Sequence, residues 1–262
     1  MTYETLLFDV SDGLAKITLN RPNAANSLNR ALAHDLMMAS IECDENPEIR
    51  AVLLTGAGKM FCAGGDLKTF HGFGDAIGGK LKELTVYLHA ATSRFSRMDP
   101  PVVVAVNGIA AGAGMSIAIS GDLVLAARSA MFTSAYTAAG LSPDGSSTYF
   151  LPRLVGLRRA QELMLTNRRL SAEEAADWGL VNKVVDDEAL TDEAEALARS
   201  LAEGATGAYG AVKKMLVESF TNPLETQMEI EARMIAERSA SPDGREGIDA
   251  FVHKRKPDFT GN

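Results

Sequence analysis

Short apolar segments that alternate with helical sequence constrain the fold of this chain most strongly. Residues 51–55, 102–106 and 122–127 are dominated by Val, Leu and Ala, with almost no polar alternation. Strands of this kind are typically buried on both faces of a parallel sheet. Segments with helical spacing precede and separate them, at 29–44 and 81–98. This order of strand and helix predicts an α/β core with right-handed crossovers.

The flanking segments predict shorter elements. Residues 6–10 and 15–20 are joined by Ser11-Asp12-Gly13, which is typical of a hairpin turn. Ser171-Ala172-Glu173-Glu174 has the capping-box pattern of a helix start. The remaining predictions are loops at 56–67 and 72–79, the second glycine-rich and mobile, strands near 131 and at 180–185, a turn at 140–145 and a helix that begins near Ser146.

The last part of the chain has a different character. From about Leu190 to His253 it is almost entirely helical and rich in Ala, Glu, Leu and Met. Turn residues interrupt it at 204–210, 222–223 and 241–244. Its helices are amphipathic, so they must pack on the core or on another subunit. We therefore predict a core at 1–189 and a C-terminal helical region for oligomerisation at 190–262.

The composition excludes several classes of function. The net charge is −8 and the pI is about 5.1, whereas nonspecific nucleic-acid binding relies on a basic surface. Cys43 and Cys62 are the only cysteines and lack metal-binding spacing, so we expect reduced thiols and no metal site. No apolar run is long enough to span a bilayer, and the N-terminus lacks a signal-peptide pattern. We therefore expect a cytoplasmic protein without nucleic-acid or membrane partners.

A glycine-rich turn, Asn-Gly-Ile-Ala-Ala-Gly-Ala-Gly at 107–114, follows the strand 102–106 and precedes an apolar helix. Backbone N–H groups and the helix dipole at such a point can hold a phosphate or an oxyanion. Two nucleotide motifs fail. The dinucleotide fingerprint lacks its third glycine, and the segment 55–59 lacks the first glycine and the final Ser or Thr of a phosphate loop. The spacing alone leaves the choice between phosphate and oxyanion open.

Several longer motifs follow one another along the chain. They are LNRPNAANSL at 19–28, FCAGGDL at 61–67, NGIAAGAG at 107–114, GLSPDGSSTYFLPRLVG at 140–156, LSAEEAADWGLVNKVV at 170–185 and REGIDAFVHKRKPDFTG at 245–261. With them the chain resembles the crotonase, or enoyl-CoA hydratase/isomerase, superfamily over essentially its whole length. The resemblance implies a crotonase-like spiral of ββα units with a C-terminal helical region. It also implies a homotrimer or a dimer of trimers.

Members of this superfamily bind acyl-CoA thioesters and hold the thioester oxygen with two backbone N–H groups. By motif, these donors correspond to Gly65 and Ala113. Removing a proton beside a thioester creates an enolate whose charge lies on that oxygen, so preorganised donors lower the barrier. Coenzyme A enters as part of the substrate, and no separate cofactor is implied. The substrate-binding residues implied are Asn23, Ala24, Ala25, Ala63, Gly64, Asp66, Leu67, Gly112, Ser116 and Tyr136.

The same resemblance suggests the reacting side chain. Hydratases of the superfamily activate water with two glutamates, and Ser116 and Tyr136 stand at those positions here. Asp144, in Ser-Pro-Asp-Gly, matches the carboxylate of the ring-epoxide isomerases of phenylacetate breakdown. A carboxylate in an apolar pocket can move a proton between neighbouring carbons. We therefore expect an acyl-CoA isomerase that acts on a 3-enoyl-CoA or a ring-derived phenylacetyl-CoA, with Asp144 as the proton shuttle.

Two alternatives stay open. The 4-chlorobenzoyl-CoA dehalogenases also resemble this chain, particularly at 158–181, and use an aspartate nucleophile with a histidine that activates water. The matching residues are Asp144 and His89, whereas Tyr136 replaces their tryptophan. Hydrolase or hydratase chemistry with these residues is the first alternative, and a non-catalytic CoA-binding or assembly subunit is the second. The candidates for contacts with the CoA phosphates are Lys213, Lys254 and Lys256.

Overall fold

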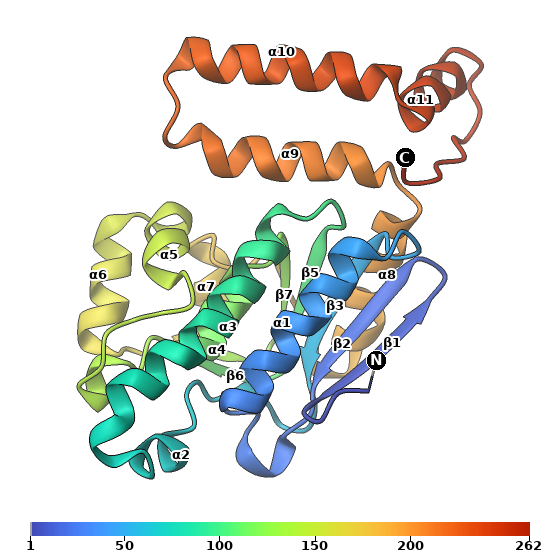
Figure 1. Ribbon diagram of the computed structural model, residues 1–262. Coiled ribbons are helices and arrows are strands. Elements are labelled where there is room, and N and C mark those ends of the chain that lie inside the picture. The colour runs from blue at the N-terminus through green and yellow to red at the C-terminus, as the bar shows by residue number, and fades with distance from the viewer. Residues whose placement is uncertain (1) are drawn as a thin grey trace.

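The computed structural model describes residues 2–262 and places two β-sheets at the centre of the molecule (Figure 1). The larger sheet has six strands in the order β1 (Leu6–Ser11), β2 (Leu14–Leu19), β3 (Ala51–Gly56), β5 (Val102–Val106), β7 (Leu123–Ala127) and β10 (Lys183–Val185). The strands β1 and β2 form an antiparallel hairpin, and the other neighbours are parallel. The predicted hairpin and the apolar strands are confirmed, with β5 buried at every position.

The smaller sheet contains β4 (Met60–Cys62), β6 (Ile109–Ala111), β8 (Met131–Thr133) and β9 (Leu170–Ser171). Each of β4, β6 and β8 follows a strand of the larger sheet after a short connection and leads toward a helix. This repeated arrangement is the spiral of ββα units that we expected. The prediction of a loop over 56–67 was wrong at β4, because a three-residue strand is too short to leave a periodic signal.

Helices cover both faces of the larger sheet. Figure 1 shows α1 (Arg30–Glu45) and α3 (Ile77–Arg97) side by side across one face, whereas α8 (Leu190–Ala202) packs on β3 and β5 from the other. Leu32 and Leu36 are almost completely buried, which confirms the predicted apolar face of α1. The remaining helical segments are η1 (Pro22–Ala24), α2 (Leu67–His71), η2 (Gly74–Ala76), α4 (Ala113–Ile119), η3 (Thr137–Ala139), α5 (Ser147–Val155), α6 (Leu157–Thr166), α7 (Ala172–Asp177) and η4 (Asp187–Ala189).

The predicted loop over 72–79 is instead largely helical, because η2 and the first turn of α3 lie within it. Gly78 and Gly79 adopt helical geometry at the start of a helix of 21 residues. Each glycine costs roughly 1 kcal/mol relative to alanine in a helix interior. The packing of the buried face of α3 against α1 offsets this cost. This packing involves distant residues, so the local sequence around Gly78 and Gly79 does not indicate a helix.

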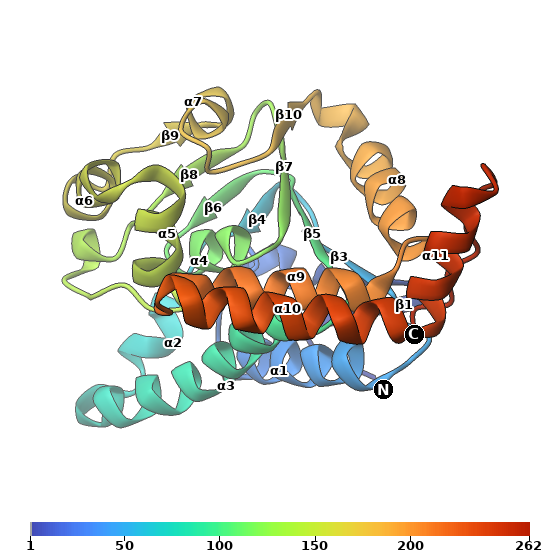
Figure 2. The ribbon, with the colours of Figure 1, turned by 90° about the horizontal axis from the view of Figure 1, so that it is seen from above.

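The C-terminal helices form an outer layer. In Figure 1 and Figure 2, α9 (Thr206–Ser219) and α10 (Leu224–Ala240) form an antiparallel hairpin above the core, and α11 (Pro242–Val252) follows at its end. The break at 222–223 is confirmed, but the predicted breaks at 204–210 and 241–244 extended too far. Gly210 lies inside α9, where it packs against Asp99. Only glycine fits there, because a Cβ atom would be 2.0 Å from the carboxylate of Asp99. This glycine permits close packing rather than a turn.

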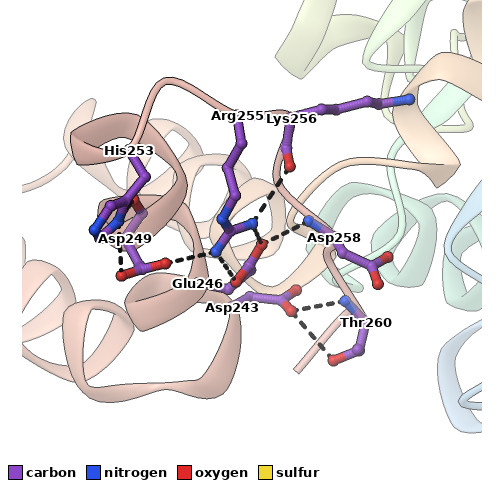
Figure 3. A network of polar contacts seen from close by, with 8 residues as sticks. All are labelled: Asp243, Glu246, Asp249, His253, Arg255, Lys256, Asp258 and Thr260. Carbon is purple, nitrogen blue, oxygen red and sulfur yellow. Dashed lines mark hydrogen bonds and ion pairs between the residues drawn. The ribbon is translucent and has the colours of Figure 1, made fainter.

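A network of ion pairs and hydrogen bonds ties the end of the chain to α11 (Figure 3). The buried Asp243 carboxylate accepts hydrogen bonds from the backbone N–H groups of Thr260 and Gly261, at 2.7 and 2.8 Å. Arg255 joins Glu246 to Asp249. The hydrogen bond from the Arg255 guanidinium is the main reason why the pKa of Glu246 is lowered to about 2. The extended C-terminus is therefore fixed beside the last helix.

Lys213 does not reach solvent, so the prediction that it contacts CoA phosphates was wrong. Its Nζ lies 2.8 Å from the carboxylate of Asp122 and donates to the carbonyl oxygens of Phe95 and Pro100 at 2.9 and 2.8 Å. The lysine side chain is 7% exposed and that of Asp122 is 25% exposed. Lys213 therefore joins α9 to the end of α3 and the start of β5.

We expect Lys213→Met to lower the free energy of unfolding by about 2–3 kcal/mol, because it leaves a partly buried carboxylate without its partner. Burial already raises the pKa of Asp122 against the attraction of Lys213, and the substitution raises it further. A group with a raised folded-state pKa weakens the fold as the pH rises through that pKa. Urea denaturation should therefore reveal a larger loss at pH 8 than at pH 5.

Lys214→Met is the matched control for this prediction. Lys214 is adjacent in sequence, but its side chain is 45% exposed and pairs with Asp99 at the surface. Exposed ion pairs contribute little to stability. Equal losses for the two variants would contradict a structural role for the buried lysine.

Candidate active site

Two glycine-containing loops come into backbone contact, one after β4 and the other before α4. Gly64 has φ of +91°, and a Cβ atom there would lie 2.7 Å from the carbonyl oxygen of Ala111. A Cβ atom on Gly114 would lie 2.2 Å from the carbonyl oxygen of Cys62. Because no side chain tolerates these distances, glycine is required at both positions for the loops to meet.

Each loop contributes a backbone N–H group with no hydrogen-bond acceptor among residues 2–262, at Gly65 and at Ala113. Ala113 is the first residue of α4, where N–H groups have no acceptor within the helix. Beside Gly65, the Gly64 carbonyl accepts from Leu28 and the Asp66 N–H donates to Leu28, which turns the Gly65 N–H to the opposite side. The two predicted donors are therefore brought together at one cavity.

This cavity has a volume of about 240 Å³ and a largely apolar lining. Among the predicted site residues, those that line it are Ala63, Gly64, Gly65, Leu67, Gly112, Ala113, Tyr136 and Asp144. Those that do not are Asn23, Ala24, Ala25, Asp66, Ser116 and His89. In the described part of the chain, Asp144 is the only carboxylate in the lining, and it lies in the same cavity as the two free N–H groups.

The segment 23–25 borders the cavity without lining it. The carbonyl of Ala25 accepts a hydrogen bond from the N–H of Ala63 at 3.0 Å, and Asn23 is exposed. The segment therefore lies at the surface beside the loop that carries Gly65. This position suits contacts with the part of a ligand that remains outside the cavity.

Asp66 has a structural role in this loop. Its carboxylate caps α2 by accepting from the N–H of Thr69 at 3.1 Å, and it pairs with Arg21 at 3.0 Å. Burial raises the pKa of this carboxyl, but the hydrogen bond from Thr69 and the charge of Arg21 together lower it below its ordinary value. Arg21, which the sequence reasoning missed, thereby fixes the loop that holds Gly65.

A line of hydrogen bonds reaches Asp144 from the start of α4. The hydroxyl of Tyr136 donates to Oδ1 of Asp144 at 2.6 Å, and it lies 3.0 Å from the hydroxyl of Ser116. Ser116 is completely buried, and its Oγ is also 3.3 Å from the carbonyl oxygen of Gly112. Burial, and then the charge of Asp144, raise the pKa of Tyr136. The phenol therefore stays protonated and acts as a donor.

His89 lies on the other side of Asp144. Its Nε2 accepts a hydrogen bond from the N–H of Gly145 at 3.2 Å. The ring lines a second cavity of about 460 Å³, which it shares with Arg97, Tyr149 and Asp144 itself. Asp144 therefore lies between two cavities. His89 is close to Asp144, but its ring does not line the cavity that contains the two free N–H groups.

Sequence reasoning missed most of the apolar wall. The additional lining residues are Leu28, Phe70, Leu81, Leu84, Thr85, Ala135, Ala139, Leu141 and Ser142. Residues on the face of α3 that line a cavity have the same helical spacing as core residues, so no periodic signal separates the two. One feature of this wall can be seen only in the backbone. Ala135, which lines the cavity, has the left-handed φ of +57° that few alanines adopt.

The described residues, 2–262, contain neither a metal-binding cluster nor a membrane-spanning helix. No group of three or more His, Cys, Asp or Glu side chains in this range has an arrangement that could hold a metal ion. None of the helices described combines the length and the apolar character that crossing a membrane requires.

Known proteins match this chain over nearly its whole length. The family model described as enoyl-CoA hydratase/isomerase matches residues 9–262. The chain is 42% identical to the 1,2-epoxyphenylacetyl-CoA isomerase of Escherichia coli (strain K12), covering 98% of this chain and 99% of that protein. It is also 42% identical to a Rhodobacter capsulatus protein named "Probable enoyl-CoA hydratase", covering 100% of both.

A solved structure agrees with these sequence matches. The crystal structure of an enoyl-CoA hydratase from Polaromonas sp. JS666 superposes with a TM-score of 0.92 at 33% identity, covering 97% of this chain and 99% of that chain. The crotonase-like fold expected from the motifs is therefore confirmed. On the matched residues and the shared fold, the chain belongs to the enoyl-CoA hydratase/isomerase family.

Proposed function

We propose that this protein is an acyl-CoA isomerase that uses Asp144 as its only proton shuttle. One observation carries the proposal: in the part of the chain described, Asp144 is the single carboxylate in an apolar cavity that also presents the free N–H groups of Gly65 and Ala113. Adding water with a glutamate pair needs a second carboxylate in the lining. Moving a proton from one carbon to another needs only one.

The proposed reaction balances without any added reagent. The thioester oxygen accepts hydrogen bonds from Gly65 and Ala113, and Asp144 removes a proton from the carbon beside the thioester. The electron pair of the broken C–H bond forms an enolate, whose negative charge those two donors stabilise. When a C=C bond follows that carbon, as in a 3-enoyl-CoA, the enolate is conjugated with it. Asp144 then returns the proton to the far end of the conjugated system, the thioester C=O bond re-forms, and the double bond moves toward the thioester. Coenzyme A takes part only as the carrier within the substrate.

Outside the cavity, we propose that the CoA portion lies along 23–25 and 63–67. The hydrogen bond between Ala25 and Ala63 joins these segments, and Asn23 is exposed beside them. Lys254 and Lys256 remain candidates for the phosphates, although Lys256 pairs with Glu203 at 2.9 Å in this chain. A 3-enoyl-CoA or a ring-derived phenylacetyl-CoA intermediate supplies the acidic C–H bond that this chemistry requires.

We also propose that the chain assembles as a homotrimer or a dimer of trimers. The support is a set of apolar side chains that are more than half exposed on the outer helices: Leu216, Phe220, Leu224, Met228, Ile235, Ile248, Phe251 and Val252. Exposed apolar surface of this extent typically marks an interface with another protein. Light scattering on the purified protein would give the mass directly.

A second candidate function is hydrolysis or hydration that uses His89. The favouring observation is the hydrogen bond from Gly145 to His89 Nε2, which places the ring beside the loop of Asp144. If His89 activates water, His89→Gln should abolish turnover. Under the isomerase proposal this variant should retain most of its rate, because the ring lines the other cavity.

The proposed function is tested by NMR in D2O with 3-enoyl, 2-enoyl and arylacetyl CoA thioesters. Deuterium that enters the carbon beside the thioester, or a double bond that changes position, would support an isomerase. Addition of water or release of free CoA would favour the second candidate. Tight binding of every thioester without any reaction would overturn both, in favour of a non-catalytic CoA-binding subunit.

A further inference from the structure

We propose that Tyr136, oriented by Ser116, is a positioning residue that holds one oxygen of ionised Asp144 and leaves the other free to carry the proton. This inference rests on the proposed function of Asp144. It goes beyond that proposal because it assigns a positioning role to Tyr136 and Ser116, neither of which transfers a proton to the substrate.

The single proton of Tyr136 is used in its hydrogen bond to Asp144, because the 2.6 Å distance to Oδ1 is typical of a hydroxyl that donates to a charged carboxylate. Tyr136 can then only accept from Ser116. The single Ser116 proton has two acceptors within reach, the phenol oxygen at 3.0 Å and the Gly112 carbonyl oxygen at 3.3 Å. When this proton points to the phenol oxygen, it strengthens the donation of the phenol to the carboxylate.

The second oxygen of the carboxylate is left open. Within residues 2–262, no donor is hydrogen-bonded to Oδ2 of Asp144, and the residue lines the acyl cavity. A carboxylate held at one oxygen has a fixed plane, so the other oxygen points in one direction. Fixing a reacting group in this way lowers the entropic cost of reaching the transition state.

The local backbone is built around this arrangement. Gly145 has φ of +59°, and a Cβ atom there would lie 2.9 Å from Cβ of Ser116. The turn that carries Asp144 therefore packs directly on the residue that orients the tyrosine. Ser116 itself is completely buried in α4, so its hydroxyl is shielded from bulk water.

Four other ionisable groups line the two cavities that Asp144 borders: Tyr136 in the acyl cavity, and His89, Arg97 and Tyr149 in the second. Among them only Tyr136 is hydrogen-bonded to the Asp144 carboxylate. Removing its hydroxyl withdraws the one donor that stabilises the ionised form. Without this donor the carboxylate loses its fixed orientation and proton transfer should slow, whereas removing the hydroxyl of a tyrosine that merely fills space would leave the rate unchanged.

The test is Tyr136→Phe, read from the kinetics of proton exchange. The value of kcat should fall roughly tenfold, KM should change little, and the acid limb of the pH profile of kcat should move to higher pH. Ser116→Ala should give a smaller loss of kcat.

Tyr87→Phe is the matched control, because its hydroxyl only accepts from Arg30 at the surface of α3. An unchanged kcat in Tyr136→Phe, while Asp144→Asn abolishes exchange, would overturn the positioning role and leave the proposed function intact. Full exchange in Asp144→Asn would instead remove the proposed function, and the positioning role of Tyr136 with it. An acid limb that vanishes in His89→Gln, and does not move in Tyr136→Phe, would also overturn the inference.

Discussion

Asp144→Asn is expected to lower the rate of proton exchange beside the thioester by roughly 1,000-fold, because an amide cannot accept the substrate proton. The substitution preserves shape, and the hydroxyl of Tyr136 can still donate to the amide oxygen in place of Oδ1. Binding of an acyl-CoA should therefore change little. Deuterium incorporation followed by NMR gives the rate, and calorimetric titration with a CoA thioester gives the affinity.

The matched control is Asp12→Asn, which makes the same change in charge far from the cavity. Asp12 lies in the turn of the β1–β2 hairpin with φ of +50°, and its side chain is 91% exposed. Asparagine tolerates this left-handed conformation well. If Asp144→Asn retains the wild-type rate of proton exchange, the carboxylate is not the proton shuttle. If the variant loses both acyl-CoA binding and proton exchange, the substitution has damaged the site.

Gly114→Ala is expected to reduce kcat about 100-fold by separating the two N–H groups that face the thioester oxygen. The added Cβ would lie 2.2 Å from the carbonyl oxygen of Cys62, which is backbone and cannot rotate away. Cys62 ends β4 and is separated from Gly65 by Ala63 and Gly64, whereas Gly114 follows Ala113. The two loops must therefore move apart, and we expect thermal stability to fall as well.

Gly78→Ala is the control for this substitution. A Cβ atom at Gly78 would meet nothing within 4 Å, and the residue lies in the first turn of α3. Alanine is the better helix former, so the control should be as stable as wild type or slightly more stable, with full activity. Wild-type kcat in a folded Gly114→Ala variant would argue against a role for the paired N–H groups.

Local sequence predicted the parts of the fold whose signal lies within a few residues. The hairpin around Gly13, the capping box at Ser171 and the buried strand β5 are all present. The errors have a common physical cause. Gly78, Gly79 and Gly210 are typical of loops in isolation, but helix packing and close approach to Asp99 decide their conformation.

The same distinction applies to the candidate site. Gly65, Ala113 and Asp144 were predicted from motifs, and all three line one cavity. The apolar wall from α3 was not predicted, because a residue that faces a cavity has the same spacing as one that faces the core. Arg21, which fixes the loop through Asp66, left no motif of its own.

By itself, the sequence determined the order of strands and helices, the family and the residues that carry its motifs, because these are patterns of neighbouring positions. Only the tertiary structure decided that Tyr136 holds Asp144, that His89 faces a second cavity and that Lys213 is buried. The last of these joins positions 118 residues apart. Such contacts depend on how distant segments pack, and no periodicity or local spacing encodes that geometry.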